Sequence, residues 1–171
     1  MGGVDKGLQP LRGKTMVEWV LARLAPQVDD VVINANQNLE RYRAFGHRVA
    51  SDQIAGFAGP LAGLHAGLKA VKHSIAVTVP CDSPFLPGDL VVRLHAALGA
   101  NDLAVAKTGE QPHPVFALVR TKVQENLEAF LAQGGRKIDA WYASLKVVEV
   151  SFDDEADAFR NINTPEELGR A

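Results

Sequence analysis

Short runs of branched and apolar residues alternate along the chain with longer segments in which apolar residues recur every three or four positions. The short runs are typical of β-strands, because β-branched residues fit a pleated, buried surface. They predict strands within residues 28–36, 46–52, 74–79, 102–107, 114–119 and 145–150. The longer segments predict helices at residues 15–28, 60–73, 87–99 and 121–135.

Residues at the ends of these segments support the helix assignments. Pro60 stands where a first helical turn tolerates proline, Asp89 lies near the start of the third helix, and Gly99 lies at its end. The run 75–79 is nearly all apolar, as expected for a strand buried on both faces. We therefore expect an α/β fold with a mostly parallel sheet and helices on both faces. Without a linker or internal repeat, residues 1–171 are predicted to form a single domain.

The composition argues against several classes of function. The 171 residues are 47% hydrophobic and 6% aromatic with a net charge of -2, which does not favour binding to nucleic acid or to an anionic membrane. The single cysteine, Cys81, excludes an internal disulfide and fits a reducing compartment. No apolar stretch reaches membrane-spanning length and no signal-peptide pattern opens the sequence, so we expect a cytoplasmic protein.

Small polar and acidic residues follow three of the predicted strands. In α/β sheets these positions lie at the carboxyl ends of the strands, where ligands bind. The residues are Asn34, Asn36, Ser51, Asp52, Cys81 and Asp82. Asp82 is the best candidate for a Mg²⁺ ligand, because this ion favours one or two carboxylates plus phosphate oxygens. Asn34 and Asp52 suit contacts to the base or sugar of a nucleotide.

Each of these residues also has an ordinary structural interpretation. Asp82 precedes Ser-Pro and is a common type of turn residue. Asn34 and Asn36 are compatible with turns at positive φ, and Asp52 with a cap on the segment that follows it.

Three glycine-rich stretches offer backbone that can approach an anion closely. The first, "MGGVDKG", places Lys6 between glycines, where its ammonium can neutralise a phosphate, although it is not a Walker loop. The second spans residues 56–67 at a predicted helix start, where the glycines suit either an anion or a base at the backbone N–H groups, or close helix packing through small residues. The third carries Arg136 and Lys137, which suit either a phosphate clamp for a second substrate or a helix C-cap and solvated turn. The alternative for Lys6 is a solvated side chain at a frayed terminus.

The sequence offers no evident protein nucleophile. The five histidines lack metal-ligand spacing, no Gly-x-Ser-x-Gly elbow is present, and Cys81 lies next to Asp82, which disfavours a thiolate. Nucleotidyl transfer needs no such nucleophile, because an ionised acceptor phosphate attacks the α-phosphorus of a nucleoside triphosphate. The protein then supplies positioning, Mg²⁺ and positive charge.

Five segments in this order resemble the molybdenum cofactor guanylyltransferases: "MGGVDKGLQPLRGK", "GPLAGLHAGL", "PCDSPFLP", "HPVFAL" and "NINTPEEL". The resemblance covers essentially the whole chain. It implies a Rossmann-like three-layer α/β/α fold and Mg²⁺-dependent transfer of GMP from GTP to molybdopterin, with release of pyrophosphate. Implied partners are GTP, molybdopterin, and the molybdoenzymes or chaperones that receive the product.

The resemblance also implies roles for individual residues. Lys6 matches the phosphate-binding lysine, Asp82 the Mg²⁺ ligand, and Asn34 and Asp52 nucleotide-contacting positions. On the molybdopterin side, the matching residues are Asn161, Asn163, Arg136 and Lys137. An alternative for Asn163 is a cap on the last helix.

The sequence departs from the family pattern at its start, where the family has an apolar strand and the first half of the glycine loop. We therefore expect the natural protein to be longer by about 15–20 residues, and the neighbours of that strand to have unpaired edges. Two other functions stay open: a related nucleotidyltransferase that uses CTP or a sugar phosphate, and a non-catalytic partner-binding domain of the same fold.

Overall fold

The computed structural model describes residues 5–54 and 59–162. All six predicted strands and all four predicted helices are present. The strands are β3 (Val32–Asn34), β4 (Arg48–Ala50), β5 (Ile75–Thr78), β6 (Leu103–Thr108), β7 (Gln111–Arg120) and β8 (Val147–Ser151). The helices are α1 (Met16–Leu24), α3 (Pro60–Ala70), α4 (Leu90–Leu98) and α5 (Gln124–Ala132). The helix ends expected at Pro60 and Gly99 are confirmed.

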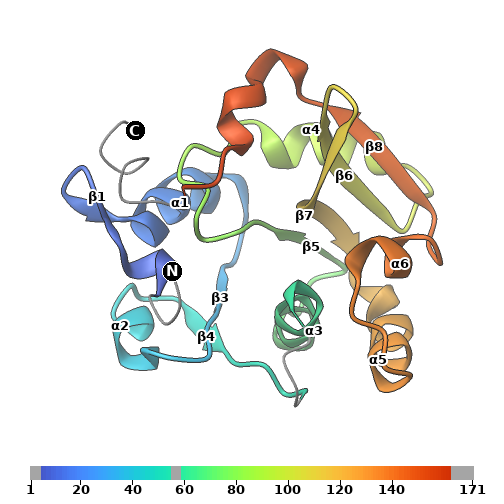
Figure 1. Cartoon of the computed structure of the whole chain (residues 1–171), viewed down its shortest axis with the longest axis horizontal. Coiled ribbons are helices and arrows are strands. Elements are labelled where there is room, and N and C mark those ends of the chain that lie inside the picture. Colours follow the sequence, from blue (N-terminus) through green and yellow to red (C-terminus); the bar gives the residue numbers. More distant parts are fainter. Residues whose placement is uncertain (1–4, 55–58, 163–171) are drawn as a thin grey trace.

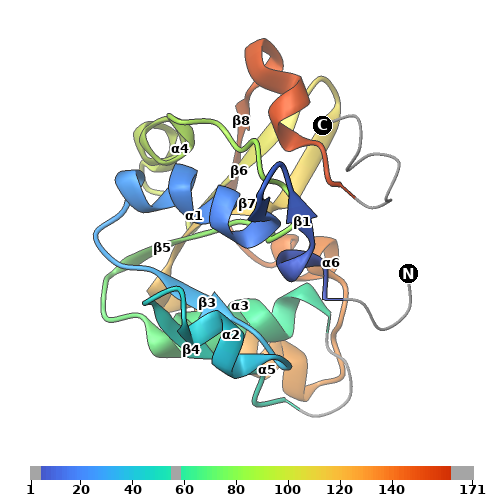
Figure 2. The same cartoon turned by 90° about the vertical axis from the view of Figure 1, so that its left-hand side faces the viewer.

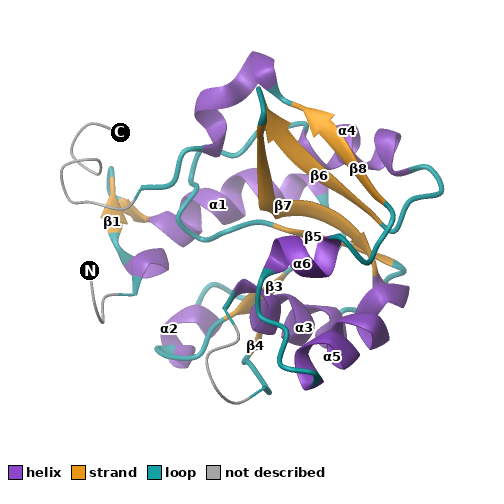
Figure 3. Ribbon diagram, turned by 45° about the vertical axis from the view of Figure 1, so that its right-hand side comes forward, coloured by secondary structure: helices purple, strands orange, loops and turns teal. Residues whose placement is uncertain are grey.

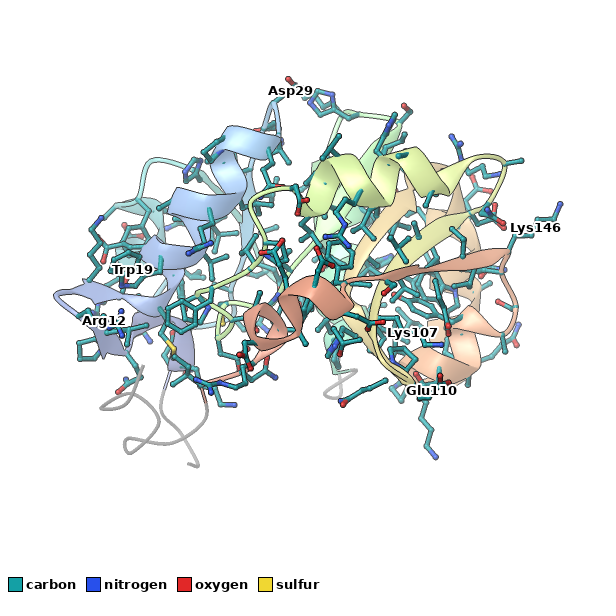
Figure 4. The ribbon with its side chains drawn as sticks, turned by 90° about the horizontal axis from the view of Figure 1, so that it is seen from above. Arg12, Trp19, Asp29, Lys107, Glu110 and Lys146 are labelled. Atoms are coloured by element: carbon teal, nitrogen blue, oxygen red, sulfur yellow. The ribbon has the colours of Figure 1, made fainter. Side chains whose placement is uncertain are left out.

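Several short elements were not predicted, because elements of two to seven residues are too short to display a clear hydrophobic period. They are the strands β1 (Pro10–Leu11) and β2 (Lys14–Thr15), the helices α2 (Leu39–Arg43) and α6 (Ile138–Tyr142), and the 3₁₀ helices η1 (Lys6–Leu8), η2 (Ala25–Gln27), η3 (Thr121–Val123) and η4 (Asp153–Phe159). The β1–β2 hairpin turns at Arg12, which Figure 4 shows at the opposite end of the molecule from Lys146. It leads into α1, where Thr15 and Glu18 form a capping box.

The main sheet has the strand order β5-β7-β6-β8. β6 and β8 are parallel, as are β3 and β4 in a separate pair, whereas β7 runs antiparallel to both β5 and β6. Of the four strands of the main sheet, β5, β6 and β8 therefore run in one direction, as expected for a mostly parallel sheet, and only β7 runs against them. The physical reason is a tight hairpin: Thr108 pairs with Gln111, and Gly109 between them adopts a φ of 53°. Such a turn reverses the chain without the crossover helix that a parallel neighbour needs.

Side chains on β6 alternate between two hydrophobic clusters, one on each face of the sheet. Leu103 and Val105 pack with α3, α5 and α6, and Ala104 and Ala106 pack with α4 and η4. Figure 3 shows α4 on one side of the sheet and α3, α5 and α6 on the other. The predicted three-layer α/β/α architecture is confirmed, and it follows from the two-residue repeat of a strand buried on both faces.

The parallel pair β3–β4 lies at the end of the molecule opposite β8 (Figures 1 and 2). Within residues 5–54 and 59–162, β3 pairs only with β4 and β5 only with β7, so each of these two strands has one unpaired edge there. The described part of the chain contains no helix that is long and apolar enough to cross a bilayer.

Candidate functional site

Lys6 and Asp82, which are 76 positions apart in the sequence, meet in the structure. Lys6 begins η1, and Asp82 lies in the loop that follows β5. The Lys6 ammonium Nζ lies 3.3 Å from the Asp82 carboxylate oxygen Oδ2. The Asp82 side chain is only 13% exposed, whereas that of Lys6 is 39% exposed. A carboxylate and an ammonium therefore face each other in a position that solvent reaches from the lysine side.

Asn34 and Asp52 form a second predicted pair. The Asn34 side-chain amide donates to Asp52 Oδ1 at 3.0 Å, and the Asn36 amide donates to Asp52 Oδ2 at 2.8 Å. The Asp52 backbone N–H in turn donates to Asn36 Oδ1 at 2.9 Å. Because β3 and β4 are parallel, the residues that follow them reach the same edge and hold one another in place.

The helix α3 approaches this network through Gly63. A Cβ atom at Gly63 would lie 2.7 Å from Asn34 Oδ1, so only a glycine leaves this amide in its observed position. The start of α3 therefore lies directly beside the polar residues after β3 and β4. This close approach explains one glycine of the second glycine-rich stretch; residues 56–58 of that stretch lie outside the described residues.

The loop that carries Asp82 also contacts the segment after η4. The Ile162 backbone N–H donates to the Asp82 carbonyl at 2.9 Å, and the Ser83 hydroxyl donates to Asn161 Oδ1 at 2.6 Å. Figure 1 shows these two segments side by side. Ser83 is fully buried and orients the Asn161 amide, a role that the sequence analysis missed although Ser83 lies inside the quoted segment "PCDSPFLP".

Arg136 caps the carboxyl end of α5, as the structural interpretation of this stretch predicts. Its guanidinium Nη1 donates to the carbonyls of Leu131 and Gly135, at 2.9 and 2.6 Å, at the carboxyl end of α5. Lys137 is the N-cap residue of α6. Their assignment to a second substrate therefore stays a prediction. Asn163 lies outside the described residues.

A cavity of about 470 Å³ lies beside Asn161, between the β6–β7 hairpin and η4. His113 lines it and stacks on Phe159, with ring centroids 4.7 Å apart. His113 Nε2 lies 2.7 Å from Thr108 Oγ1, and burial lowers the pKa of His113, which favours the neutral ring at neutral pH. The volume is in the range of small-molecule sites, and the lining offers one aromatic wall and one amide edge.

The donor set around Asp82 fits Mg²⁺ better than a transition metal. Among residues 5–54 and 59–162, no three His, Cys, Asp or Glu side chains gather in a group able to hold a metal ion. Mg²⁺ does not need such a group, because it keeps several waters and takes one or two carboxylates plus substrate phosphates. The neighbouring thiol is a poor competitor: burial, together with the Asp82 carboxylate, raises the pKa of Cys81 to about 11.

Similar proteins agree on one family. Residues 1–147 match the model of the MobA-like NTP transferase domain. The chain is 48% identical over 172 residues to a molybdenum cofactor guanylyltransferase of Shewanella sp. strain MR-4, an alignment that covers 99% of this chain and 87% of the relative. It is 51% identical over 175 residues to the protein of the same name from Cupriavidus necator, covering 98% of this chain and 87% of that one.

Solved structures give the same result for the fold. The molybdopterin-guanine dinucleotide biosynthesis protein A of Archaeoglobus fulgidus is 27% identical, with a TM-score of 0.79, and the match covers 98% of this chain and 89% of that one. A cytidylyltransferase from Thermus thermophilus, at 19% identity and a TM-score of 0.74 over 97% and 91% of the two chains, shares the fold. The chain therefore belongs to the MobA-like NTP transferase family and is a nucleotidyltransferase.

Proposed function

We propose that this chain transfers GMP from GTP to molybdopterin and releases pyrophosphate, as a single nucleotidyltransferase domain over residues 1–171. The observation that carries the proposal is the Lys6–Asp82 pair at the end of β5, in a chain about half identical to named molybdenum cofactor guanylyltransferases. In this reaction an oxygen of the acceptor phosphate forms a bond to the α-phosphorus of GTP. The bond from that phosphorus to the β-phosphate oxygen breaks, and pyrophosphate takes the electron pair.

Lys6 and Asp82 have complementary parts in this proposal. The Lys6 ammonium neutralises charge on the triphosphate, and Asp82 is the proposed Mg²⁺ ligand. Bound Mg²⁺ supplies further positive charge to the phosphate oxygens. The two side chains form an ion pair with each other at 3.3 Å. In the proposed complex Lys6 exchanges Asp82 for the triphosphate, and Asp82 exchanges Lys6 for Mg²⁺, so that each gains a partner with a larger opposite charge.

Asn34 and Asp52 are proposed to contact the guanine base. Both Asp52 oxygens accept an amide N–H, from Asn34 and from Asn36, and each oxygen retains a further lone pair. A carboxylate with free acceptor capacity suits the adjacent N–H groups on the Watson–Crick edge of guanine. CTP lacks this pair of adjacent ring and exocyclic donors, so the network favours GTP over CTP.

The acceptor is proposed to occupy the cavity beside Asn161, with the molybdopterin ring system against His113 and Phe159. Asn163, Arg136 and Lys137 complete the proposed molybdopterin side. Replacing Arg136 and Lys137 together should raise the apparent KM for molybdopterin and leave GTP affinity almost unchanged. A fall in GTP affinity alone would reverse the assignment of these two residues.

The proposal is tested by titrating the chain with GTP in the presence and absence of Mg²⁺, with CTP as competitor. We expect Mg²⁺-dependent binding in which GTP clearly outcompetes CTP, followed by transfer of labelled GMP to molybdopterin. Preference for CTP would indicate a related nucleotidyltransferase, and a folded chain without nucleotide binding would indicate a partner-binding domain. We place the reaction in the cytoplasm, where molybdoenzymes or their chaperones receive the product.

A further inference from the structure

The residue before Lys6 makes a separate set of contacts. The Asp5 carboxylate accepts a hydrogen bond from the Tyr42 hydroxyl at 2.5 Å on Oδ1, and a second from the Asn38 side-chain amide at 2.9 Å on Oδ2. Tyr42 is in α2 and is buried, and Asn38 is the residue before this helix. Both oxygens of Asp5 are therefore held by one short helix that is distant from it in sequence.

The Asn38 side chain bonds to Asp5 and makes no capping hydrogen bond to its own helix. Asn38 is the N-cap residue of α2, a position where asparagine usually accepts a hydrogen bond from the first turn of its own helix. No such side-chain cap bond is present at Asn38, and its backbone adopts a left-handed φ of 53°, which asparagine tolerates better than most residues. The amide points to Asp5 instead, so the start of α2 is built around this carboxylate.

The next turn of chain is closely packed against the same helix. A Cβ atom on Gly7 would lie 2.6 Å from the Tyr42 hydroxyl oxygen and 3.3 Å from Cys81 Cβ. The loop therefore passes between Tyr42 and the segment that carries Asp82. Because the Asp5 carbonyl also accepts the Leu8 backbone N–H at 3.2 Å, fixing Asp5 fixes the first turn of η1, where Lys6 stands.

We infer that Asp5 is a positioning residue: held by Tyr42 and Asn38, it fixes the loop so that the Lys6 ammonium meets the triphosphate beside Asp82. This inference rests on the proposed function, because it assigns the phosphates to Lys6. Asp5 acts through Lys6 and does not itself touch the substrate. We call the contacts of Asp5 with Tyr42 and Asn38 the Asp5 latch.

The test removes one hydroxyl from the latch. Tyr42→Phe keeps the buried ring and deletes the hydrogen bond to the Asp5 carboxylate. We expect GTP–Mg²⁺ to bind about tenfold more weakly, because one hydrogen bond to a charged group is strong enough to change the population of the binding-competent loop by about that factor. Guanosine, which has no phosphates, should bind as it does to the wild-type protein.

Tyr142→Phe is the matched control. Tyr142 is also buried, and its hydroxyl donates to the Pro114 carbonyl at 2.6 Å. Both variants lose the hydrogen bond of a buried tyrosine hydroxyl, to a carboxylate for Tyr42 and to a backbone carbonyl for Tyr142, so both should lose stability. Only Tyr42→Phe should weaken GTP relative to guanosine, and equal effects of the two variants would overturn the latch.

An exchange of the two groups provides a rescue. Asp5→Asn places two side-chain amides opposite each other and should weaken GTP binding. Adding Asn38→Asp restores one donor and one acceptor at this contact, and aspartate tolerates the left-handed backbone at this position. We expect the double variant to recover most of the lost affinity, and no recovery would count against the latch.

A second measurement is independent of any nucleotide. Cys81 is exposed as a residue, but its side chain lies against Gly7, so a loosened loop should uncover the thiol. We expect Tyr42→Phe to be alkylated at Cys81 several-fold faster than Tyr142→Phe. If the wild-type chain binds no GTP, the proposed function fails, and equal alkylation rates would overturn the latch separately.

Discussion

Replacing Asp82 with alanine separates catalysis from stability most clearly. Asp82→Ala should lower the free energy of unfolding only slightly. The Asp82–Lys6 contact is 3.3 Å long and the lysine side chain is 39% exposed, so this ion pair contributes about 0–1 kcal/mol. In turnover, the loss should be large, because removing a carboxylate from a Mg²⁺ site acts on the transition state. We expect turnover to fall at least about 100-fold, on the order of 3 kcal/mol.

Asp102→Ala is the matched control for this prediction. The Asp102 side chain is 18% exposed, compared with 13% for Asp82, and its Oδ1 lies 2.9 Å from Lys122 Nζ. Asp102 Oδ2 also accepts the Lys146 backbone N–H at 3.0 Å, and these two hydrogen bonds lower the pKa of Asp102. This variant should therefore lose more stability than Asp82→Ala, about 1–2 kcal/mol, and keep its turnover.

The assay follows transfer of labelled GMP to molybdopterin at saturating substrates, with thermal unfolding of each variant measured in parallel. We expect activity and stability to change in opposite order: Asp82→Ala, which loses less stability, should lose turnover, and Asp102→Ala, which loses more stability, should keep it. Turnover within about threefold of wild type in a folded Asp82→Ala protein would reduce Asp82 to a turn residue. A comparable loss of turnover in Asp102→Ala would show that the effect comes from general destabilisation.

Two further predictions use pairs of similar residues. Gly63→Ala should displace the Asn34 amide and weaken guanosine binding in a folded protein, as measured by isothermal titration. The control is Gly67→Ala in the same helix, where an added Cβ atom meets nothing within 4 Å. Thermal unfolding should show that this control variant is stabilised by about 0.5–1 kcal/mol. Burial raises the pKa of both tyrosines of the chain, Tyr42 and Tyr142, in the folded protein. Their protonated hydroxyls therefore stabilise the fold fully below the unfolded pKa of about 10. This stabilisation is lost as the pH rises through the pKa values of the folded protein. We expect tyrosinate absorbance to appear together with alkaline unfolding, and a separate titration of either tyrosine near pH 10 in the folded protein would contradict this.

The sequence by itself determined the α/β class and the positions of the longer elements. Hydrophobic periodicity is a local signal, and it is strong in segments such as α1 and α4, which have nine residues each. It is weak in α2 and α6, which have five residues each and were missed. The sequence also placed polar residues after three strands. The residues that follow a strand can be identified from the sequence alone, because this does not require knowing which strands lie beside it in the sheet.

The tertiary structure decided which of these residues act together. Lys6 meets Asp82 across 76 positions and Ser83 meets Asn161 across 78, and such contacts depend on strand order and on the packing of distant segments. The antiparallel course of β7 had the same origin, since it depends on a two-residue turn rather than on the composition of the strand. Local patterns fix what each segment can form, whereas the burial of both sheet faces fixes which loops come together at one edge.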